Sequence, residues 1–294
     1  MTDNELFAAP VQGARPRSTA SVGASAARRS QASAIETTPR ARIASGRRPW
    51  ALAGLIVPAG LVGLWQLTTS IGLFSLVQLP PPGLVLQAGL DLLERGLLTQ
   101  YVAISTQRVV TGFAIGASLG LLLGAVTGLA RSWNAVLGPT LGAVRAVPSL
   151  AWVPLLILWL KIGEESKLTL IAIGAFFPVY TTVSAALRHV DRQLVEAGRA
   201  FGLRGARLFT TIQLPAVLPS VISGLRLALA QSWLFLVAAE LIASSSGLGF
   251  LLVDSQYNGR VDRILLAIIL LAVLGKTTDS VIGLFERWAS RRWT

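Results

Sequence analysis

Residues 196–215 read EAGRAFGLRGARLFTTIQLP, and this polar stretch is flanked by two long apolar runs, Leu168–Leu187 and Val217–Ile242. Each run is long enough for a helix to cross a hydrocarbon core of about 30 Å, at about 1.5 Å per residue. The stretch between them is too polar to cross lipid and too regularly patterned for a flexible linker. It therefore predicts a structured loop between two membrane-spanning helices.

The pattern of this loop predicts two short helices joined at a glycine. A helical spacing of apolar residues begins the loop: Val190, Leu194, Ala197 and Phe201. Gly202 can adopt the left-handed conformation that ends such a helix. The apolar side of the second helix consists of Leu208, Phe209 and Ile212. Pro215 is expected to stop that helix before the next span begins.

Two short helices with apolar faces and surrounding arginines suit docking into a groove on a partner protein. The alternative is that the apolar faces pack against the underside of the helix bundle itself. The pattern alone does not decide between docking and packing.

The composition of the whole chain requires a bilayer as solvent. Its 294 residues are 53% hydrophobic and only 14% charged, whereas soluble domains are about one quarter charged. The mean hydropathy is +0.63. The fold class predicted is an all-α membrane protein, since backbone groups in lipid must be satisfied within each segment. The six transmembrane helices are expected at Trp50–Ser70, Val109–Ala130, Leu137–Leu160, Leu168–Leu187, Val217–Ile242 and Arg263–Phe285.

The third span is the least regular of the six. It contains Pro148 and Pro154, which we expect to kink the helix without preventing it from spanning. It also contains Arg145, whose long stem is expected to bring the charge to the inner interface.

The chain divides into a tail and a membrane domain. Residues 1–48 are rich in Ala, Ser and Arg and nearly free of large apolar side chains, so we expect a disordered cytoplasmic tail. The tail also has no apolar core typical of a cleavable signal peptide. Residues 49–294 form the predicted transmembrane domain, with the structured loop at 188–216.

The positions of the basic residues predict the orientation, because cytoplasmic flanks of membrane spans are rich in Lys and Arg. One set of flanks holds Arg40, Arg42, Arg47, Arg48, Arg131, Arg188, Arg192, Arg199, Arg204, Arg207, Arg287, Arg291 and Arg292. The other set holds only Arg95, Lys161, Lys167 and Arg260. We therefore expect both termini and the 188–216 loop to be cytoplasmic, in a multi-pass protein of the bacterial inner membrane.

A ladder of glycines runs along the second span. Its members are Gly112, Gly116, Gly120, Gly124 and Gly128. Residues four apart lie on nearly one helix face, so another helix can approach closely along it. Packing within the chain is the favoured interpretation, and a contact across a dimer is the alternative.

Arg226, Trp233 and Glu240 lie seven residues apart and therefore share one face of the fifth span, with about 21 Å between the first and the last. Ionisable groups in a span usually face a cavity or a protein partner. One interpretation is that this face lines a pathway through the membrane, with Arg226 attracting an anion. The other is pairing between helices. In the sixth span, Lys276 and Asp279 are expected to pair with each other.

Several classes of site are excluded by residue content. The chain has no Cys and a single His, His189, which leaves no two-histidine or cysteine metal site, and none is predicted. Nucleic-acid binding is not expected, because the basic residues lie between apolar runs rather than on one basic and aromatic face. Gly275-Lys276-Thr277 ends like a phosphate-binding loop, but Leu270 replaces the glycine that such a loop needs. We expect no cofactor on this chain.

The loop resembles the signature loop of ABC importer permeases, which reads E-A-A, three residues, G, nine residues, I-x-L-P. The residues in register are Glu196, Ala197, Gly202, Ile212, Leu214 and Pro215. Gly198 replaces the second alanine, a change expected to loosen the helix slightly. The coupling residues that the resemblance and the apolar pattern select are Glu196, Ala197, Gly198, Gly202, Leu203, Phe209, Ile212, Leu214 and Pro215.

The resemblance extends to the strings VPSLAWVPLLILW (147–159), SGLRLALAQSW (223–233), VAAELI (237–242), GLGFLL (247–252) and LGKTTD (274–279). These look like the branch that imports aliphatic sulfonates, taurine or nitrate. The resemblance implies the type I ABC importer permease fold and a second permease copy, as a homodimer. It also implies cytoplasmic ATPase subunits that bind ATP and grip the coupling loop, and an extracytoplasmic substrate-binding protein. The chain itself would not be an enzyme.

Two other classes compete with this interpretation. A secondary transporter of a small solute would show paired broken helices or acidic residues near mid-membrane. A membrane-embedded hydrolase would need convergent catalytic groups. Transport that stops when a separate ATPase is inactivated would favour the permease over both.

Overall fold

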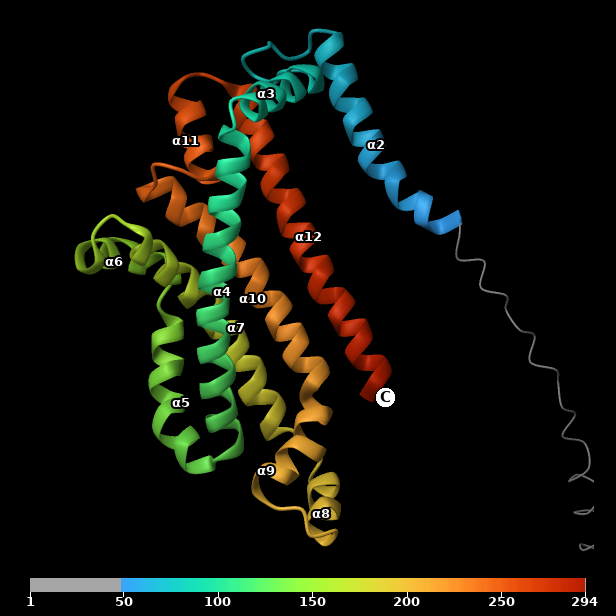
Figure 1. The fold of residues 1–294 in the computed structure, drawn as a ribbon, viewed down its shortest axis with the longest axis vertical. Coiled ribbons are helices and arrows are strands. Elements are labelled where there is room, and N and C mark those ends of the chain that lie inside the picture. The colour runs from blue at the N-terminus through green and yellow to red at the C-terminus, as the bar shows by residue number, and fades with distance from the viewer. Residues whose placement is uncertain (1–48, 294) are drawn as a thin grey trace, which may run out of the picture. The chain divides into compact units, whose positions relative to one another are not determined.

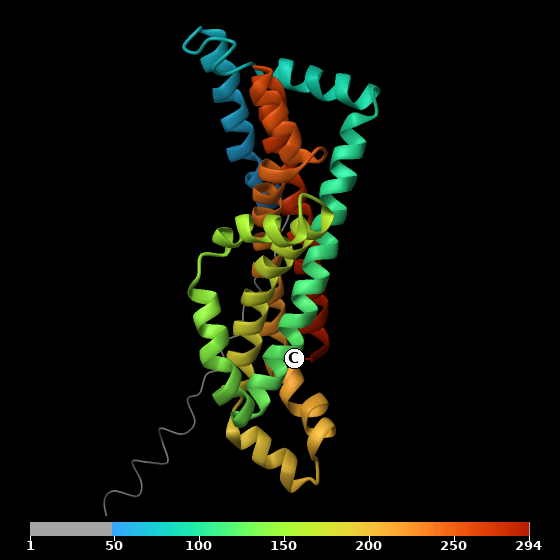
Figure 2. The ribbon, with the colours of Figure 1, turned by 90° about the vertical axis from the view of Figure 1, so that its left-hand side faces the viewer.

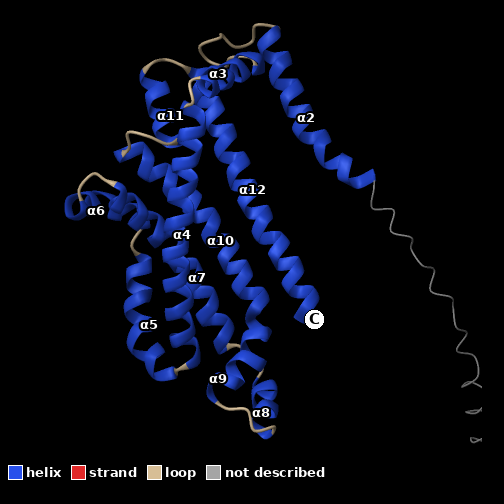
Figure 3. Ribbon diagram, in the orientation of Figure 1, coloured by secondary structure: helices blue, strands red, loops and turns tan. Residues whose placement is uncertain are grey.

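The computed structural model describes residues 49–293, and the predicted tail at 1–48 lies outside the described residues. The described residues form helices and loops without a strand (Figure 3). The first elements are α2 Pro49–Ser70, α3 Pro82–Glu94, α4 Leu97–Leu129, α5 Arg131–Ala146, the 3₁₀ turn η1 Ser149–Trp152 and α6 Val153–Leu160. They are followed by α7 Glu164–Arg188, α8 Arg192–Ala200, α9 Gly205–Leu208, the π-helical turn η2 Phe209–Gln213, α10 Leu214–Ala243, α11 Leu248–Tyr257 and α12 Val261–Trp293.

Four stretches of the described residues are helical, long and apolar enough to cross a membrane: Leu97–Leu129, Glu164–Arg188, Gly205–Ile242 and Val261–Arg287. They contain the predicted fourth, fifth and sixth spans, and all of the predicted second span except its last residue, Ala130 (Figure 1). Helix α2, 22 residues long, covers the predicted first span. The total of six crossings stays a prediction.

The predicted third span is not one kinked helix. Helix α5 and the η1–α6 segment are bent by 86° at the break between them, so α6 lies across the long helices (Figure 2). Val147 has the extended conformation, φ −70° and ψ 126°, which the following Pro148 favours by sterically excluding the helical one. The prolines therefore interrupt the helix where kinks alone were expected.

Helices α4 and α7 pack along the glycine ladder. A Cβ atom at Gly120 would lie 2.8 Å from the Phe176 carbonyl oxygen, and one at Gly128 would lie 2.8 Å from Leu187 Cβ. At Gly116 the added atom would overlap the Ala172 carbonyl oxygen. Only glycine lets the two backbones come this close, so the prediction of packing within the chain is confirmed.

The two ends of the helix bundle carry different elements. Helices α8 and α9 extend beyond the bundle at one end, which we call the α8 end, and α3 and α11 lie at the other, which we call the α11 end (Figures 1 and 2). At the α11 end, α3 buries Val85 and Leu92 against Leu248 and Leu251 of α11. Helix α7 lies at the centre of the bundle, between α4 and α10.

Candidate functional site

Helix α8 is capped at both ends by its own sequence. At its start, the Asp191 carboxylate accepts a hydrogen bond from the Gln193 backbone N–H at 2.8 Å. At its end, Gly202 has φ +81°, its N–H donates to the Arg199 carbonyl at 2.9 Å, and the N–H of Leu203 donates to Gly198 at 3.0 Å. These paired hydrogen bonds and the left-handed glycine form a Schellman motif, so the predicted role of Gly202 in ending the helix is confirmed.

Gly198 determines how closely α8 approaches the following helical stretch. It is the buried residue of α8, and a Cβ atom there would lie 2.8 Å from Leu208 Cδ1 and 3.2 Å from Ile212 Cγ1. The departure from the alanine of the signature loop therefore has a packing consequence that the sequence did not reveal. The two short helices are held against each other by Leu208 and Ile212.

Pro215 does not stop the second helix, which corrects the sequence-based expectation. Helical structure continues from Gly205 through the π-helical turn Phe209–Gln213 into α10. Proline cannot donate to the helix ladder, and its ring clashes with the carbonyl four residues earlier in a regular α-helix. The wider π-helical turn lies at this place, immediately before Leu214, so the chain passes the proline without a break.

The first apolar face of this segment is left uncovered by the described residues. Phe201 is 87% exposed and Leu194 is 49% exposed, whereas Leu208 is buried. Packing within the chain thus covers the second helix and Val190, but it leaves Leu194 and Phe201 exposed. Among the other coupling residues, Glu196, Ala197 and Leu214 are exposed, and Leu203, Phe209, Ile212 and Pro215 are partly buried.

Arg226 and Trp233 join α10 to α12. The Arg226 guanidinium donates to both carboxylate oxygens of Asp279, at 2.8 and 2.9 Å, and to Glu286 at 3.0 Å. Trp233 Nε1 donates to Thr278 Oγ1 at 3.0 Å. Lys276 Nζ is 3.6 Å from Asp279, whose closer partner is Arg226. The alternative of pairing between helices therefore describes the Arg226 contacts, and a role of this face in the pathway stays a prediction.

Glu240 turns away from α12 and pairs with α4. Its buried carboxylate accepts hydrogen bonds from Arg108 at 2.6 Å, from Ser105 at 2.9 Å and from the Gly249 backbone N–H at 2.8 Å. Gly247 has φ +112°, and a Cβ atom there would overlap the Glu240 carboxylate. The structure does not bring Glu240 together with Arg226 and Trp233.

Arg108 is the centre of a buried ionic network that the sequence analysis missed. Its guanidinium, 4% exposed, also donates to both oxygens of Glu164, at 2.8 and 2.6 Å, and to the Ser246 carbonyl at 2.7 Å. Lys167 donates to the same Glu164 carboxylate at 3.0 Å. The network ties α4, the start of α7, the end of α10 and the loop before α11. The available signal was an arginine directly before the predicted second span.

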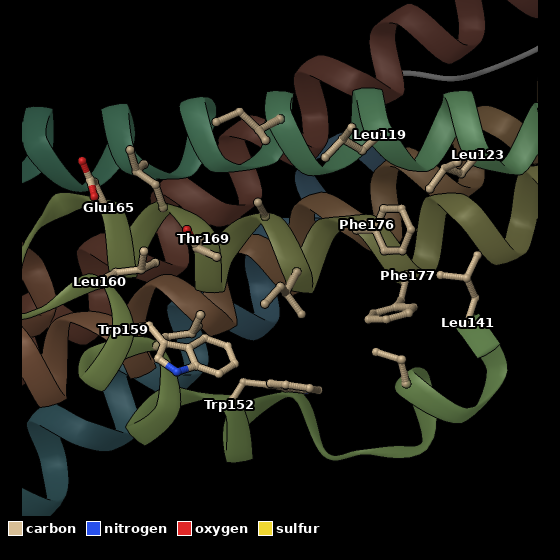
Figure 4. A pocket seen from close by; sticks show the side chains of 16 residues that line it. Leu119, Leu123, Leu141, Trp152, Trp159, Leu160, Glu165, Thr169, Phe176 and Phe177 are labelled. Atoms are coloured by element: carbon tan, nitrogen blue, oxygen red, sulfur yellow. The ribbon is translucent and has the colours of Figure 1, made fainter. Parts of the chain in front are cut away.

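Two cavities adjoin α5 and α7. The larger, with a volume of about 820 Å³, is apolar and lies among α4, α5, α6 and α7. Figure 4 shows side chains from these helices facing it, among them Leu119, Leu123, Trp152, Trp159, Phe176 and Phe177. The second, about 590 Å³, shares Leu141 with the first and has polar lining residues: Asn134, Arg145, Tyr180, Thr181, Ser184 and Arg188.

These features define an all-α membrane protein with a capped helical segment at one end of its bundle and a buried ionic network at the other. Residues 116–291 match the family model described as "Binding-protein-dependent transport system inner membrane component". The chain belongs to this family, whose members are the permeases of ABC transporters.

Curated relatives cover most of the chain. The putative aliphatic sulfonates transport permease protein SsuC of Escherichia coli (strain K12) is 43% identical over 83% of this chain and 91% of its own length. Its counterpart in Bacillus subtilis (strain 168) is 39% identical over 80% of this chain and 86% of its own length. The bicarbonate transport system permease protein CmpB of Synechococcus elongatus is 31% identical over 88% of this chain and 98% of its own length.

The fold is shared with a solved transporter. An inward facing structure of the MetNI methionine ABC transporter aligns with a TM-score of 0.57 and 19% identity, over 67% of this chain and 96% of that one. The predicted fold class, an ABC importer permease, is thereby confirmed.

Proposed function

We propose that this chain is the permease subunit of an ATP-driven importer and that residues 192–213 form the segment that a separate ATPase subunit grips. The observation that carries this proposal is the exposed apolar face of α8, with Phe201 at 87% exposure on a capped helix. A large exposed aromatic side chain on a rigid element is typical of an interaction site.

The segment is connected closely enough to the helix bundle for its displacement to move the bundle helices. Its second helix is continuous with α10, and only the residues around His189 separate α8 from α7. Because α7 packs on both α4 and α10, a rigid displacement of the segment acts directly on the central helices. ATP-driven closure of two partner ATPases would thus change the helix arrangement without any nucleotide bound to this chain.

The orientation and partners follow from the same assignment. The loop carries Arg188, Arg192, Arg199, Arg204 and Arg207, which favours a cytoplasmic position for the α8 end. Both chain termini are then cytoplasmic, and the α11 end faces the substrate-binding protein. A second copy of the permease completes the pathway.

The transported solute is proposed to be a small oxyanion. The relatives are named for aliphatic sulfonates and for bicarbonate, and both solutes are monoanions whose charge lies on oxygen atoms. Aliphatic sulfonates are the first choice, because the relatives of higher identity carry that name.

The test is uptake by vesicles that contain the permease together with the ATPase subunit and the substrate-binding protein of the same transporter. We expect accumulation of a radiolabelled alkanesulfonate that requires ATP and stops when the ATPase carries an inactive catalytic site. Uptake that continues with the inactive ATPase would contradict the proposal and indicate a secondary transporter.

A further inference from the structure

Arg145 is a charge inside the predicted membrane domain without a partner. Its exposed side chain forms no hydrogen bond or ion pair with any of the described residues. An ionised side chain within a membrane-crossing segment is expensive, and such residues face a cavity or a counter-charge. The buried or half-buried arginines, Arg108, Arg226 and Arg263, each have a carboxylate partner.

Arg145 lies near the end of α5, far along the helix from its start. Helix α5 begins at Arg131, so Arg145 lies about 21 Å further along the helix axis at about 1.5 Å per residue. That distance is far greater than the reach of one side chain. Beyond Arg145 the chain bends by 86°, so α6 does not continue along the axis of α5.

The cavity beside Arg145 is polar and carries no acidic lining residue. Tyr180, Thr181 and Ser184 of α7 line it together with Arg188, which donates to Asn134 at 2.7 Å. Thr181 Oγ1 donates to the Phe177 carbonyl at 2.9 Å, and Ser184 Oγ lies 3.0 Å from Thr127 Oγ1. Such a lining favours a ligand that accepts hydrogen bonds and carries negative charge.

The apolar cavity shares the lining residue Leu141 with the polar one. Its volume of about 820 Å³ lies within the range of roughly 300–1,000 Å³ usual for small-molecule sites. Glu165 is the charged residue among its lining residues, and it sits in the first turn of α7. About 24 Å of helix separates Glu165 from Thr181, so this acid is remote from Arg145.

We propose that the two cavities form one binding site for an amphipathic monoanion, in which Arg145 holds the oxyanion head and the apolar cavity holds the aliphatic tail. This site deepens the proposed function and rests on it, because it names the part of the permease that recognises the solute. Neither guanidinium that lines the polar cavity, Arg145 or Arg188, has a carboxylate partner among the described residues. An oxyanion presents the acceptor atoms that a guanidinium fork binds.

The head-group interaction is tested by direct binding. The purified permease–ATPase complex in lipid nanodiscs is titrated with methanesulfonate, butanesulfonate and octanesulfonate, by calorimetry and by the fluorescence of Trp152 and Trp159. We expect affinity to rise about fourfold for each methylene that enters the apolar cavity. Arg145→Ala should weaken all three ligands by roughly 10- to 100-fold, and Arg145→Lys should restore part of the loss. Arg131→Ala, on the same helix, is the matched control and should change nothing.

The tail interaction is tested separately. Leu119 lines the apolar cavity, so Leu119→Trp places a larger side chain in it and reduces its free volume (Figure 4). This variant should weaken octanesulfonate by at least about tenfold and leave methanesulfonate unchanged. Leu122→Trp is the matched control, because Leu122 is exposed on α4 and does not line the cavity.

Unchanged affinity in folded Arg145→Ala, or equal loss of the short and long ligands in Leu119→Trp, would overturn the site. Loss of the permease dimer in these variants, seen by native mass spectrometry while anion affinity is unaltered, would mean that the cavities are part of the contact with the second copy. That result would also overturn the proposed binding site. ATP-dependent uptake by the wild type separates the two proposals. If the wild type shows ATP-dependent uptake while the Arg145 variants bind the sulfonates normally, the importer function is supported and the binding site is wrong. If the wild type shows no such uptake, the importer function itself is wrong.

Discussion

The two ends of this helix bundle reverse the usual distribution of polar and apolar side chains. At the α11 end, the buried Arg108 pairs with the buried Glu240 and with Glu164, whose side chain is exposed. At the α8 end, Phe201 and Leu194 are exposed on a short capped helix. The buried charges are paired within the chain, whereas Phe201 is left largely uncovered by the described residues. The charges of the first end are therefore satisfied within the chain, whereas the apolar surface of the second is the one that we propose to bind another protein.

Removing the centre of the ionic network should have the largest effect on stability. Arg108→Ala leaves two carboxylates, Glu240 and Glu164, without their main partner. We expect the free energy of unfolding to fall by about 3–5 kcal/mol, the usual consequence of breaking a buried pair on one side. Thermal unfolding of the purified protein in detergent measures it. Arg95→Ala, which breaks an exposed pair with Asp91, is the control and should lower stability by about 1 kcal/mol at most; an equal loss in both variants would refute the distinction.

Overpacking the α4–α7 contact should have the next largest effect. A methyl group at Gly120 would lie 2.8 Å from the Phe176 carbonyl oxygen, and a backbone atom cannot move aside easily. Gly120→Ala should therefore lower the free energy of unfolding by about 1–3 kcal/mol. The control is Gly142→Ala in α5, where an added Cβ meets nothing within 4 Å. The packing argument would be wrong if denaturant curves showed the two variants to be equally stable.

A side chain at Gly202 should have a smaller effect on stability and a large one on transport. Its φ of +81° is unfavourable for any residue with a Cβ, at about 1–2 kcal/mol. Gly202→Val should thus loosen the end of α8, and we expect ATP hydrolysis to continue while uptake falls. Gly163→Val is the control, because its φ of −170° is open to every residue. Normal uptake by Gly202→Val would count against a rigid coupling segment.

Phe201→Ala should have almost no effect on folding, which makes it the sharpest contrast with Arg108. An exposed side chain contributes within about 0.5 kcal/mol to stability. If its surface binds the ATPase, however, uptake should fall by at least about tenfold. Arg199→Ala, exposed on the same helix, tests whether any change in α8 has this effect. A large loss of thermal stability in Phe201→Ala would mean that the residue belongs to the fold and not to an interface.

The sequence predicted the long helices well because their apolar length is a local property. It also located the end of α8, because the glycine conformation at 202 depends on its neighbours. The Arg108 network was missed because its partners lie 56 and 132 residues away, and no local pattern connects them. The prolines at 148 and 154 marked an irregular third span, but the 86° bend depends on how α6 packs. Pro215 was misread because the π-helical turn that accommodates it has no simple sequence signal.

The central claim is that the α8 end faces the cytoplasm and is held by an ATPase subunit. The chain contains no cysteine, so Phe201→Cys provides a single reactive position. In the assembled transporter, we expect a short bifunctional thiol reagent to cross-link position 201 to the ATPase, and a membrane-impermeant maleimide to leave it unlabelled from outside intact cells. Labelling from outside, or the lack of any cross-link to a nucleotide-hydrolysing partner, would contradict the account.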